Sequence, residues 1–321
     1  MKHEKYLMTG SMAAALAAAD CAVAVDETVD ATEQQVIFGG DSRHDYGAMT
    51  PYDQRLARSV AAQFGHVSCA GATCTLPTAP WVEAPVWDDH DRDPETDRVE
   101  RPAHLCTDVR FYGQQGGAAC TGALVAPDLI LTARHCKPQD AKFVFGFFAD
   151  ANGDNEVTEV PASDVYECVS AHIGSDSGSD WALCRLDRPV RNRPVLPVRY
   201  TTPPEQDSAL VNLAHHTGLP LKSGVGWQMG ILNAQRFLHN VDTKGGASGS
   251  PFFQQGRVVG MHVVGFAEAF VRRFGGTTCA EYATCDLMGC GGHPEGFHKA
   301  QRIDVMGHNI PLFPAGIVSV L

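Results

Sequence analysis

Short apolar runs separated by turn-forming residues dominate the sequence from about residue 103 to the C-terminus. They include ACTGALVAP, LILTARHC, KFVFGFFA, VYECVS, WALCRL, ALVNLA and RVVGMHVVGF, and each is bounded by Gly, Pro, Asn or Asp. Many short strands at close spacing with turn signals are typical of antiparallel barrels or sandwiches rather than of βαβ units. The sequence therefore predicts an all-β fold.

The length and charge of the chain narrow the function classes. At roughly 150 residues per domain, 321 residues predict about two domains. The formal net charge of −12 argues against nucleic acid and against an anionic membrane surface as partners. No run of 18 or more apolar residues occurs, so the sequence predicts no membrane-spanning helix.

The N-terminus has the pattern of a secretory signal peptide. Two lysines precede an alanine-rich stretch from Met12 to Ala19, and Ala22–Ala24 fits a small-x-small cleavage site. Cleavage after Ala24 removes Cys21 and leaves an even number of the 11 cysteines, which suits disulfides in an oxidising compartment. Cleavage after Ala19, or lipid attachment at Cys21, are the alternatives. We expect residues 1–24 to be a signal peptide and the protein to be secreted, either extracellular or periplasmic.

Residues 25–102 are expected to form an N-terminal extension, part of which could be a pro-region. Within it, Asp53–Phe64 is the best helix candidate, because its apolar residues recur at helical spacing. Residues 83–102 are rich in acidic residues and proline, which predicts an exposed linker or long surface loop.

Three separated segments carry the residue types of a nucleophilic triad. A serine hydroxyl needs a base within hydrogen-bond reach, and that base needs a carboxylate to fix its tautomer and stabilise its charge. His135, Asp180 and Ser248 supply one residue of each type, in the order His, Asp, Ser, whereas α/β-hydrolases have the order Ser, acid, His. Ser248 lies in a glycine-dense turn, where the N–H groups of Gly246 and Ser248 could form an oxyanion hole.

The segments TARHC, SDWALCRL and GGASGSP resemble the active-site motifs of chymotrypsin-like serine proteases. The resemblance is strongest to the bacterial branch of glutamyl endopeptidases and secreted trypsin-like peptidases, and it extends from about Cys106 to the C-terminus. It implies two antiparallel six-stranded β-barrels with the triad in the cleft between them. Barrel 1 would span 103–190 and barrel 2 would span 191–321.

The same resemblance implies a serine endopeptidase, with Ser248 as nucleophile, His135 as general base and Asp180 as its orienting carboxylate. Its substrates would be proteins or peptides. We expect no cofactor and a monomeric enzyme. We expect no bound metal either: Asp150–Glu156 looks like the start of a calcium loop, but Pro161 stands where such a loop needs glutamate.

Animal members of the family have a disulfide with the spacing of Cys120 and Cys136, which pins the histidine loop. The resemblance therefore implies this pair. Cys168–Cys184 and Cys69–Cys74 are further plausible pairs. The remaining cysteines can pair in three ways: Cys106, Cys279, Cys285 and Cys290.

Activation differs from that of the animal zymogens. Those proteases carry Asp before the nucleophile, where it pairs with the newly cut N-terminal amine, whereas Ala247 cannot make this pair. Val36–Gly40 nevertheless resembles a mature N-terminus of the bacterial branch. The sequence thus predicts a propeptide that ends near Gln35.

The substrate pocket allows two interpretations. Asp242 lies where trypsin has the carboxylate that binds Arg or Lys at P1, the substrate residue before the cleaved bond. Thr243 and His262 lie where glutamyl endopeptidases have the hydroxyl and imidazole that bind an acidic P1 residue, and Gly265 ends the same apolar segment as His262. The two interpretations compete unless Asp242 turns away. We favour acidic P1 residues; the alternatives are basic P1 residues and a catalytically silent binding protein.

Overall fold

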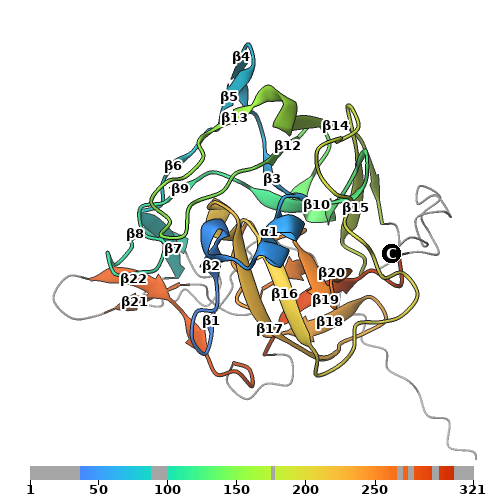
Figure 1. Cartoon of the computed structure of the whole chain (residues 1–321). Coiled ribbons are helices and arrows are strands. Elements are labelled where there is room, and N and C mark those ends of the chain that lie inside the picture. Colours follow the sequence, from blue (N-terminus) through green and yellow to red (C-terminus); the bar gives the residue numbers. More distant parts are fainter. Residues whose placement is uncertain are drawn as a thin grey trace, which may run out of the picture. The chain divides into compact units, whose positions relative to one another are not determined.

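The computed structural model describes residues 37–87, 100–174, 178–265, 270–273, 278–290 and 296–306 (Figure 1). The predicted signal peptide, Cys21, Val36 and most of the acidic segment 83–102 lie outside these ranges. In the described residues no helix is long and apolar enough to cross a membrane.

Barrel 1 is a closed ring of six antiparallel strands, in the order β10-β11-β15-β14-β12-β3. The strands are β3 (Val60–Phe64), β10 (Cys120–Ala126), β11 (Leu129–Ala133), β12 (Lys142–Phe145), β14 (Val165–Ile173) and β15 (Trp181–Leu186).

Barrel 2 has the strand order β16-β19-β20-β24-β18-β17, and pairing between β16 and β17 closes it. Its strands are β16 (Ala209–Ala214), β17 (Lys222–Ile231), β18 (Arg236–His239), β19 (Pro251–Gln254), β20 (Arg257–Val264) and β24 (His298–Arg302). A short strand, β2 (His44–Asp45), adds to the outer edge of β17. The prediction of an all-β protein with two six-stranded antiparallel barrels is confirmed.

Smaller paired strands surround the barrels. They are β4 (Ser68–Ala70) and β13 (Glu159–Pro161) on either side of β5 (Thr73–Thr75), β6 (Ala79–Pro80) with β9 (Gln115–Gly116), β7 (Glu83–Trp87) with β8 (Glu100–His104), β21 (Phe270–Arg273) with β22 (Cys279–Tyr282), and β1 (Ile37–Phe38) with β23 (Thr284–Cys285). The two ends of the predicted acidic linker, β7 and β8, thus pair with each other as antiparallel strands.

The predicted helix over Asp53–Phe64 is wrong in its second half. Helix α1 covers only Pro51–Ala57, with Thr50 as N-cap accepting from the Asp53 N–H, and the following Val60–Phe64 is strand β3. All five residues of β3 are buried, because the strand lies between β10 and β12. A short apolar run fits a buried strand as well as a helix face. Barrel 1 therefore includes a strand from the region expected to be an extension.

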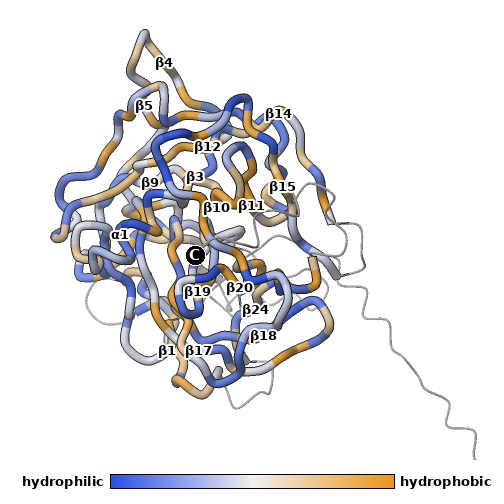
Figure 2. Tube along the Cα trace, turned by 45° about the vertical axis from the view of Figure 1, so that its right-hand side comes forward, coloured by the Kyte–Doolittle hydropathy of each residue, from blue (hydrophilic) through white to orange (hydrophobic). Residues whose placement is uncertain are grey.

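Strands β10 and β11 are buried along their whole length because both of their faces are covered. Successive side chains of a strand point to opposite faces. Leu124 and Ile130 fill the interior of barrel 1, while Val125 and Leu131 belong to the largest cluster. Figure 2 shows the resulting apolar stretches along both strands.

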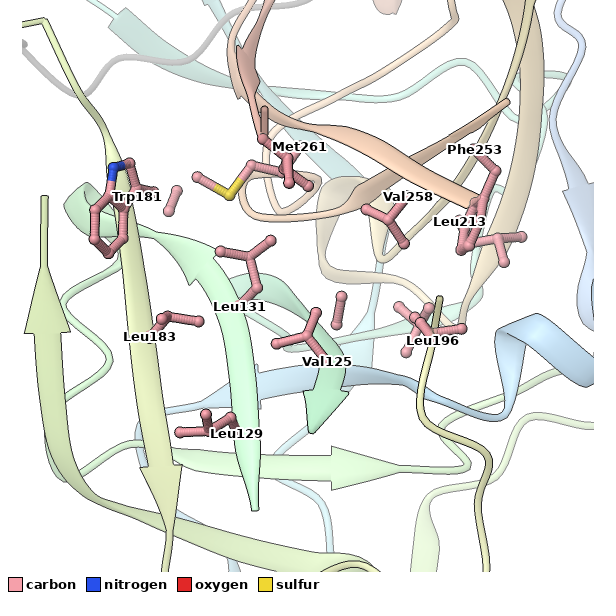
Figure 3. Close-up of a cluster of buried hydrophobic side chains, with 14 of the residues drawn as sticks. Val125, Leu129, Leu131, Trp181, Leu183, Leu196, Leu213, Phe253, Val258 and Met261 are labelled. Carbon is pink, nitrogen blue, oxygen red and sulfur yellow. The ribbon is translucent and has the colours of Figure 1, made fainter. Parts of the chain in front are cut away.

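The largest hydrophobic cluster joins the two barrels. Its side chains come from strands of both, as Figure 3 shows: Val125, Leu129, Leu131, Trp181 and Leu183 from barrel 1, with Leu213, Phe253, Val258 and Met261 from barrel 2. This shared core fixes β11 and β15 relative to β19 and β20.

Candidate active site

His135 and Asp180 are brought together by the pairing of β11 with β15. His135 lies in the 3₁₀ turn η3 (Arg134–Cys136) that directly follows β11, and Asp180 directly precedes β15. The His135 ring nitrogen Nδ1 lies 2.7 Å from Asp180 Oδ2, and the His135 backbone N–H donates to Oδ1 over 3.1 Å. A carboxylate only accepts, so the contact places the ring hydrogen on Nδ1 and leaves Nε2 as the basic nitrogen.

Asp180 is also contacted from barrel 2. Its own N–H donates to Oε1 of Gln301 on β24 over 3.0 Å, and its side chain is only 1% exposed. The Asp180 backbone is therefore held by β24 of barrel 2, while its carboxylate contacts the histidine turn that follows β11.

The glycines around Ser248 are required by the close approach of other chain segments. Gly246 has φ +84°, and a Cβ there would lie 2.4 Å from the His215 carbonyl oxygen. Gly249 has φ +82°, and a Cβ there would lie 2.3 Å from the Thr121 carbonyl oxygen. Only glycine combines left-handed backbone with this lack of space. The turn is thus packed tightly against both the Thr121 strand and the His215 turn.

The Ser248 backbone lies against the histidine loop. The Thr121 N–H donates to the Ser248 carbonyl oxygen over 2.9 Å, and the Cys136 sulfur lies 3.8 Å from the same oxygen. Cys120 and Cys136 form the expected disulfide. Segments that are far apart in sequence are thereby joined next to His135.

All ten cysteines of the described residues are paired. The plausible pairs Cys69–Cys74 and Cys168–Cys184 are both present. The four unassigned cysteines pair as Cys106–Cys279 and Cys285–Cys290. Among the described residues, the one group with metal-ligand geometry is Cys120, His135 and Cys136, and its two sulfurs are used in a disulfide.

Asp242 is 1% exposed, and both of its carboxylate oxygens accept hydrogen bonds. Oδ1 accepts from the Phe38 N–H over 2.8 Å, and Oδ2 accepts from the Ser42 N–H and the Ser42 hydroxyl, each over 2.8 Å. Burial raises the pKa of Asp242, against the opposing effect of these hydrogen bonds and of Arg43.

His262 belongs to a group of three buried histidines inside barrel 2. His239 Nε2 lies 3.2 Å from His262 Nδ1, and the ring centroids of His239 and His298 are 5.4 Å apart. Burial, reinforced by His262 and His298, lowers the pKa of His239 well below its ordinary value, so that this ring is neutral. The backbone of His262 pairs with the turn of Ser248, since its carbonyl accepts from the Gly249 N–H over 2.8 Å.

His239 and His298 are not among the site residues that the sequence predicts. The one local signal for His239 is its position three residues before Asp242. His298 lies directly opposite His239 in the β18–β24 pairing, but this register is visible only once the barrel is closed.

Thr243 is fully buried, and its hydroxyl has no hydrogen-bond partner within the described part of the chain. Burying a hydroxyl without a partner costs free energy, so such a group in a native protein calls for an explanation. Gly265 directly follows β20, after which residues 266–269 lie outside the described ranges.

Comparison with known proteins agrees with this architecture. A profile of the trypsin-like peptidase domain matches residues 120–261, which contain His135, Asp180 and Ser248. Snake venom serine proteinase 11 of Crotalus adamanteus is 30% identical over 183 residues, which are 46% of this chain and 68% of that protein. Snake venom serine protease KN11 of Trimeresurus stejnegeri is 31% identical over 100 residues, 30% of this chain and 38% of that protein.

Two solved protease structures are similar to this chain at low sequence identity. A Glu endopeptidase aligns with a TM-score of 0.43 at 16% identity, covering 78% of this chain and 94% of that chain. A serine endoprotease from Yersinia pestis aligns with a TM-score of 0.43 at 14% identity, covering 81% of this chain and 65% of that chain. The domain match, the venom relatives and the two closed barrels together lead to one conclusion: the chain belongs to the chymotrypsin-like serine proteases and is a trypsin-like serine endopeptidase.

Proposed function

We propose that Ser248, His135 and Asp180 form the catalytic triad of this endopeptidase. The observation that carries the proposal is the 2.7 Å contact between His135 Nδ1 and Asp180 Oδ2. It leaves Nε2 of His135 as the base that takes the Ser248 proton during attack on the scissile carbonyl. The protonated imidazole then gives this proton to the leaving amine, and water hydrolyses the acyl-enzyme by the same route in reverse.

The N–H groups of Gly246 and Ser248 would stabilise the negatively charged oxygen of the tetrahedral intermediate. Loss of one such donor typically costs about 10²–10³-fold in rate. The positive φ of Gly246 and the packing of its backbone against His215 support this role, because a fixed donor needs no reorganisation during the reaction.

The P1 residue would be acidic. His239 Nδ1 accepts from the Val241 N–H over 3.3 Å, so the hydrogen of this neutral ring is on Nε2. That Nε2–H faces His262 Nδ1, which must therefore accept, and the hydrogen of His262 is on its Nε2. This order makes His262 Nε2 a hydrogen-bond donor, as a substrate carboxylate requires. The buried Thr243 hydroxyl is a second candidate donor.

The contacts of Asp242 weigh against the alternative of a basic P1 residue. Its two oxygens already accept three hydrogen bonds from Phe38 and Ser42. A substrate cation would have to displace some of these donors from a buried carboxylate. The expected competition between Asp242 and an acidic substrate is reduced, because both carboxylate oxygens already accept hydrogen bonds from Phe38 and Ser42.

The enzyme would be secreted and made as a zymogen. Five disulfides are consistent with an oxidising, extracellular location, and the relatives named above are venom proteins. Ile37 and Phe38 are each 2% exposed, so a mature N-terminus at Val36 would immediately precede a buried strand. N-terminal sequencing of the secreted protein should give Val36, and a start at Val25 would contradict the proposed propeptide.

The decisive experiment is labelling with a fluorophosphonate probe, which reacts with activated serines. The wild-type protein should be labelled on Ser248, and Ser248→Ala should not be labelled. Absence of label after N-terminal processing would favour a catalytically silent binding protein. A peptide library digested by the same preparation then identifies P1: cleavage after Glu or Asp is expected, and cleavage after Arg or Lys would refute the acidic preference.

A further inference from the structure

The segment Ile37–Asp45 is held by strand pairing at both of its ends, and the partner at the β2 end belongs to barrel 2. At one end β1 pairs in parallel with β23, and at the other end β2 pairs with β17. Asp242 is contacted in between, from Phe38 and Ser42. The N-terminal segment therefore holds the first residue of the loop Asp242–Ser248 by its side chain.

We propose that Asp242 is a positioning residue that clamps the loop Asp242–Ser248 to the segment Ile37–Asp45. It does not bind the P1 side chain of the substrate. The proposal rests on the function proposed above, since it assigns the control of that same site. It gives Phe38 and Ser42 a role in activity, although neither would touch the substrate.

The chemistry of the contact fits a clamp. A buried carboxylate is costly unless donors surround it, and hydrogen bonds to a charged acceptor are stronger than neutral ones. All three donors lie at 2.8 Å, and two of them are backbone N–H groups, which side-chain rotation cannot remove. Donors on Phe38 and Ser42, four residues apart, thus fix a short stretch of chain to one side chain.

The segment that provides these donors is itself rigidly held. Arg43 is fully buried and binds Asp41 in a two-pronged contact of 2.9 and 2.8 Å. The Arg43 guanidinium carbon lies 4.6 Å from the ring centre of Tyr282. The clamp is therefore anchored to the β21–β22 hairpin as well as to barrel 2.

The loop Asp242–Ser248 also contacts the ring of Tyr282 directly. The side-chain nitrogen Nζ of Lys244, two residues after Asp242, lies 4.7 Å from the ring centre of Tyr282. Ala247, next to Ser248, has no polar side chain with which to attach this end of the loop. Asp242 supplies such an attachment from the opposite end of the loop.

The test compares Asp242→Asn, Ser42→Ala and the double variant, with Ser208→Ala as matched control. Ser208 is a half-buried serine whose hydroxyl bonds only locally, to the Gln206 carbonyl over 3.4 Å. For each protein, kcat, KM and P1 ranking are measured on a peptide library. Hydrogen exchange of the loop amides is measured in the Ser248→Ala background, where the result does not depend on catalysis.

A clamp predicts that Asp242→Asn lowers kcat about 10–100-fold and Ser42→Ala about 3–10-fold, the range expected for loss of hydrogen bonds to a charged acceptor. The P1 ranking should stay unchanged, and the double variant should lose less than the product of the two. Loop amides should exchange faster in both variants than in Ser208→Ala.

Two results would overturn the clamp. One is a changed P1 ranking in Asp242→Asn while Ser42→Ala behaves as wild type, since this is the pattern of a substrate-reading carboxylate. The other is loop exchange identical to that of the control in both variants. Because exchange is read without catalysis, failure of the proposed triad would instead appear as a lack of label on wild-type Ser248 with the clamp still detectable.

Discussion

The hydroxyl of Thr121 donates to the carbonyl oxygen of Gly246 over 2.8 Å and accepts from the His215 N–H over 3.0 Å. Both hydrogen-bonding capacities of this fully buried group are thus used. Since the Thr121 N–H also donates to the Ser248 carbonyl oxygen, one residue holds the carbonyl groups of both neighbours of Ala247, Gly246 and Ser248. Thr121 therefore sets the backbone geometry from which the proposed oxyanion hole is built.

We expect Thr121→Val to lower kcat by about tenfold or more with little change in KM, because it loosens donors used mainly in the transition state. The unfolding free energy should fall by about 1–3 kcal/mol, since two buried groups lose their partner. Steady-state kinetics and urea unfolding measure both. Thr132→Val is the control: its hydroxyl donates to the Thr121 carbonyl oxygen over 2.8 Å. Thr132→Val should lose stability but keep its kcat. Equal losses of kcat in Thr121→Val and Thr132→Val would contradict the role of Thr121.

Two disulfides of equal sequence separation allow an effect on stability to be distinguished from an effect on catalysis. Cys120–Cys136 and Cys168–Cys184 both close 16 residues, so each should contribute about 3 kcal/mol by restricting the unfolded chain. Replacing either pair by alanines should cause a similar loss in unfolding free energy. The kcat/KM should fall by about tenfold or more only without Cys120–Cys136, because a misplaced base is costly. Equal activities in the two double variants would show that this bond does not position His135.

Thr243→Val should make the free enzyme more stable and less active on acidic substrates. Removal of a buried hydroxyl without a partner should raise the unfolding free energy by about 1 kcal/mol. The same hydroxyl is a proposed donor to the P1 carboxylate, so kcat/KM should fall about tenfold for P1 Glu and much less for P1 Gln. Thr243→Ser keeps the hydroxyl and should retain the preference. A Thr243→Val variant that loses stability, and whose kcat/KM falls by the same factor for P1 Glu and for P1 Gln, would contradict the assignment.

The ordered histidine pair gives a prediction about specificity. His239→Phe removes the N–H donor that keeps His262 Nδ1 an acceptor and the hydrogen of His262 on Nε2. The kcat/KM for P1 Glu should therefore fall about 10–100-fold relative to P1 Gln. His239→Gln can still accept from Val241 and donate to His262, and it should retain part of the preference. The ratio of the two substrates in each variant measures the effect. An equal ratio of kcat/KM for P1 Glu and P1 Gln in His239→Phe and in wild type would exclude this role of His239.

The buried His215 predicts acid lability. Its burial lowers its pKa to about 3, while its Nδ1 contacts the Leu219 carbonyl oxygen at 3.0 Å. Between that pH and the ordinary histidine pKa of about 6.5, the unfolded chain binds one proton more than the folded chain. Stability therefore falls as pH is lowered through this window, by about 1.4 kcal/mol per pH unit from this residue near pH 5.

His215→Phe should remove that part of the slope, since phenylalanine can keep the stacking on Phe147, whose ring centre lies 5.6 Å away. Urea unfolding of Ser248→Ala proteins between pH 4 and 7 measures the slope without self-digestion. The exposed His66→Phe serves as control and should keep the wild-type slope. An unchanged slope in His215→Phe would contradict the prediction.

Local signals were sufficient for an all-β fold and for choosing the candidate triad, because short apolar runs, turn residues and the three motifs are properties of short segments. The two six-stranded barrels were predicted only through the resemblance that those motifs carry. Strand β3 was missed because Val60–Phe64 is apolar at positions that satisfy helix and strand alike, and only its neighbours β10 and β12 decide between them. The partners of Asp242 were inaccessible for a similar reason, since Phe38 lies 204 residues away. Contacts of that range depend on closure of the whole fold, which no local pattern encodes.

The Cys106–Cys279 disulfide joins residues 173 positions apart and closes that part of the polypeptide into a covalent ring, and His135, Asp180 and Ser248 all lie inside it. A protease in concentrated solution attacks its own surface loops. One cut within this ring linearises it without releasing a fragment, so both new ends stay attached to the same molecule. Self-cleavage would then be visible only after reduction, and a nicked enzyme would still hold its three candidate catalytic groups on one covalently joined molecule.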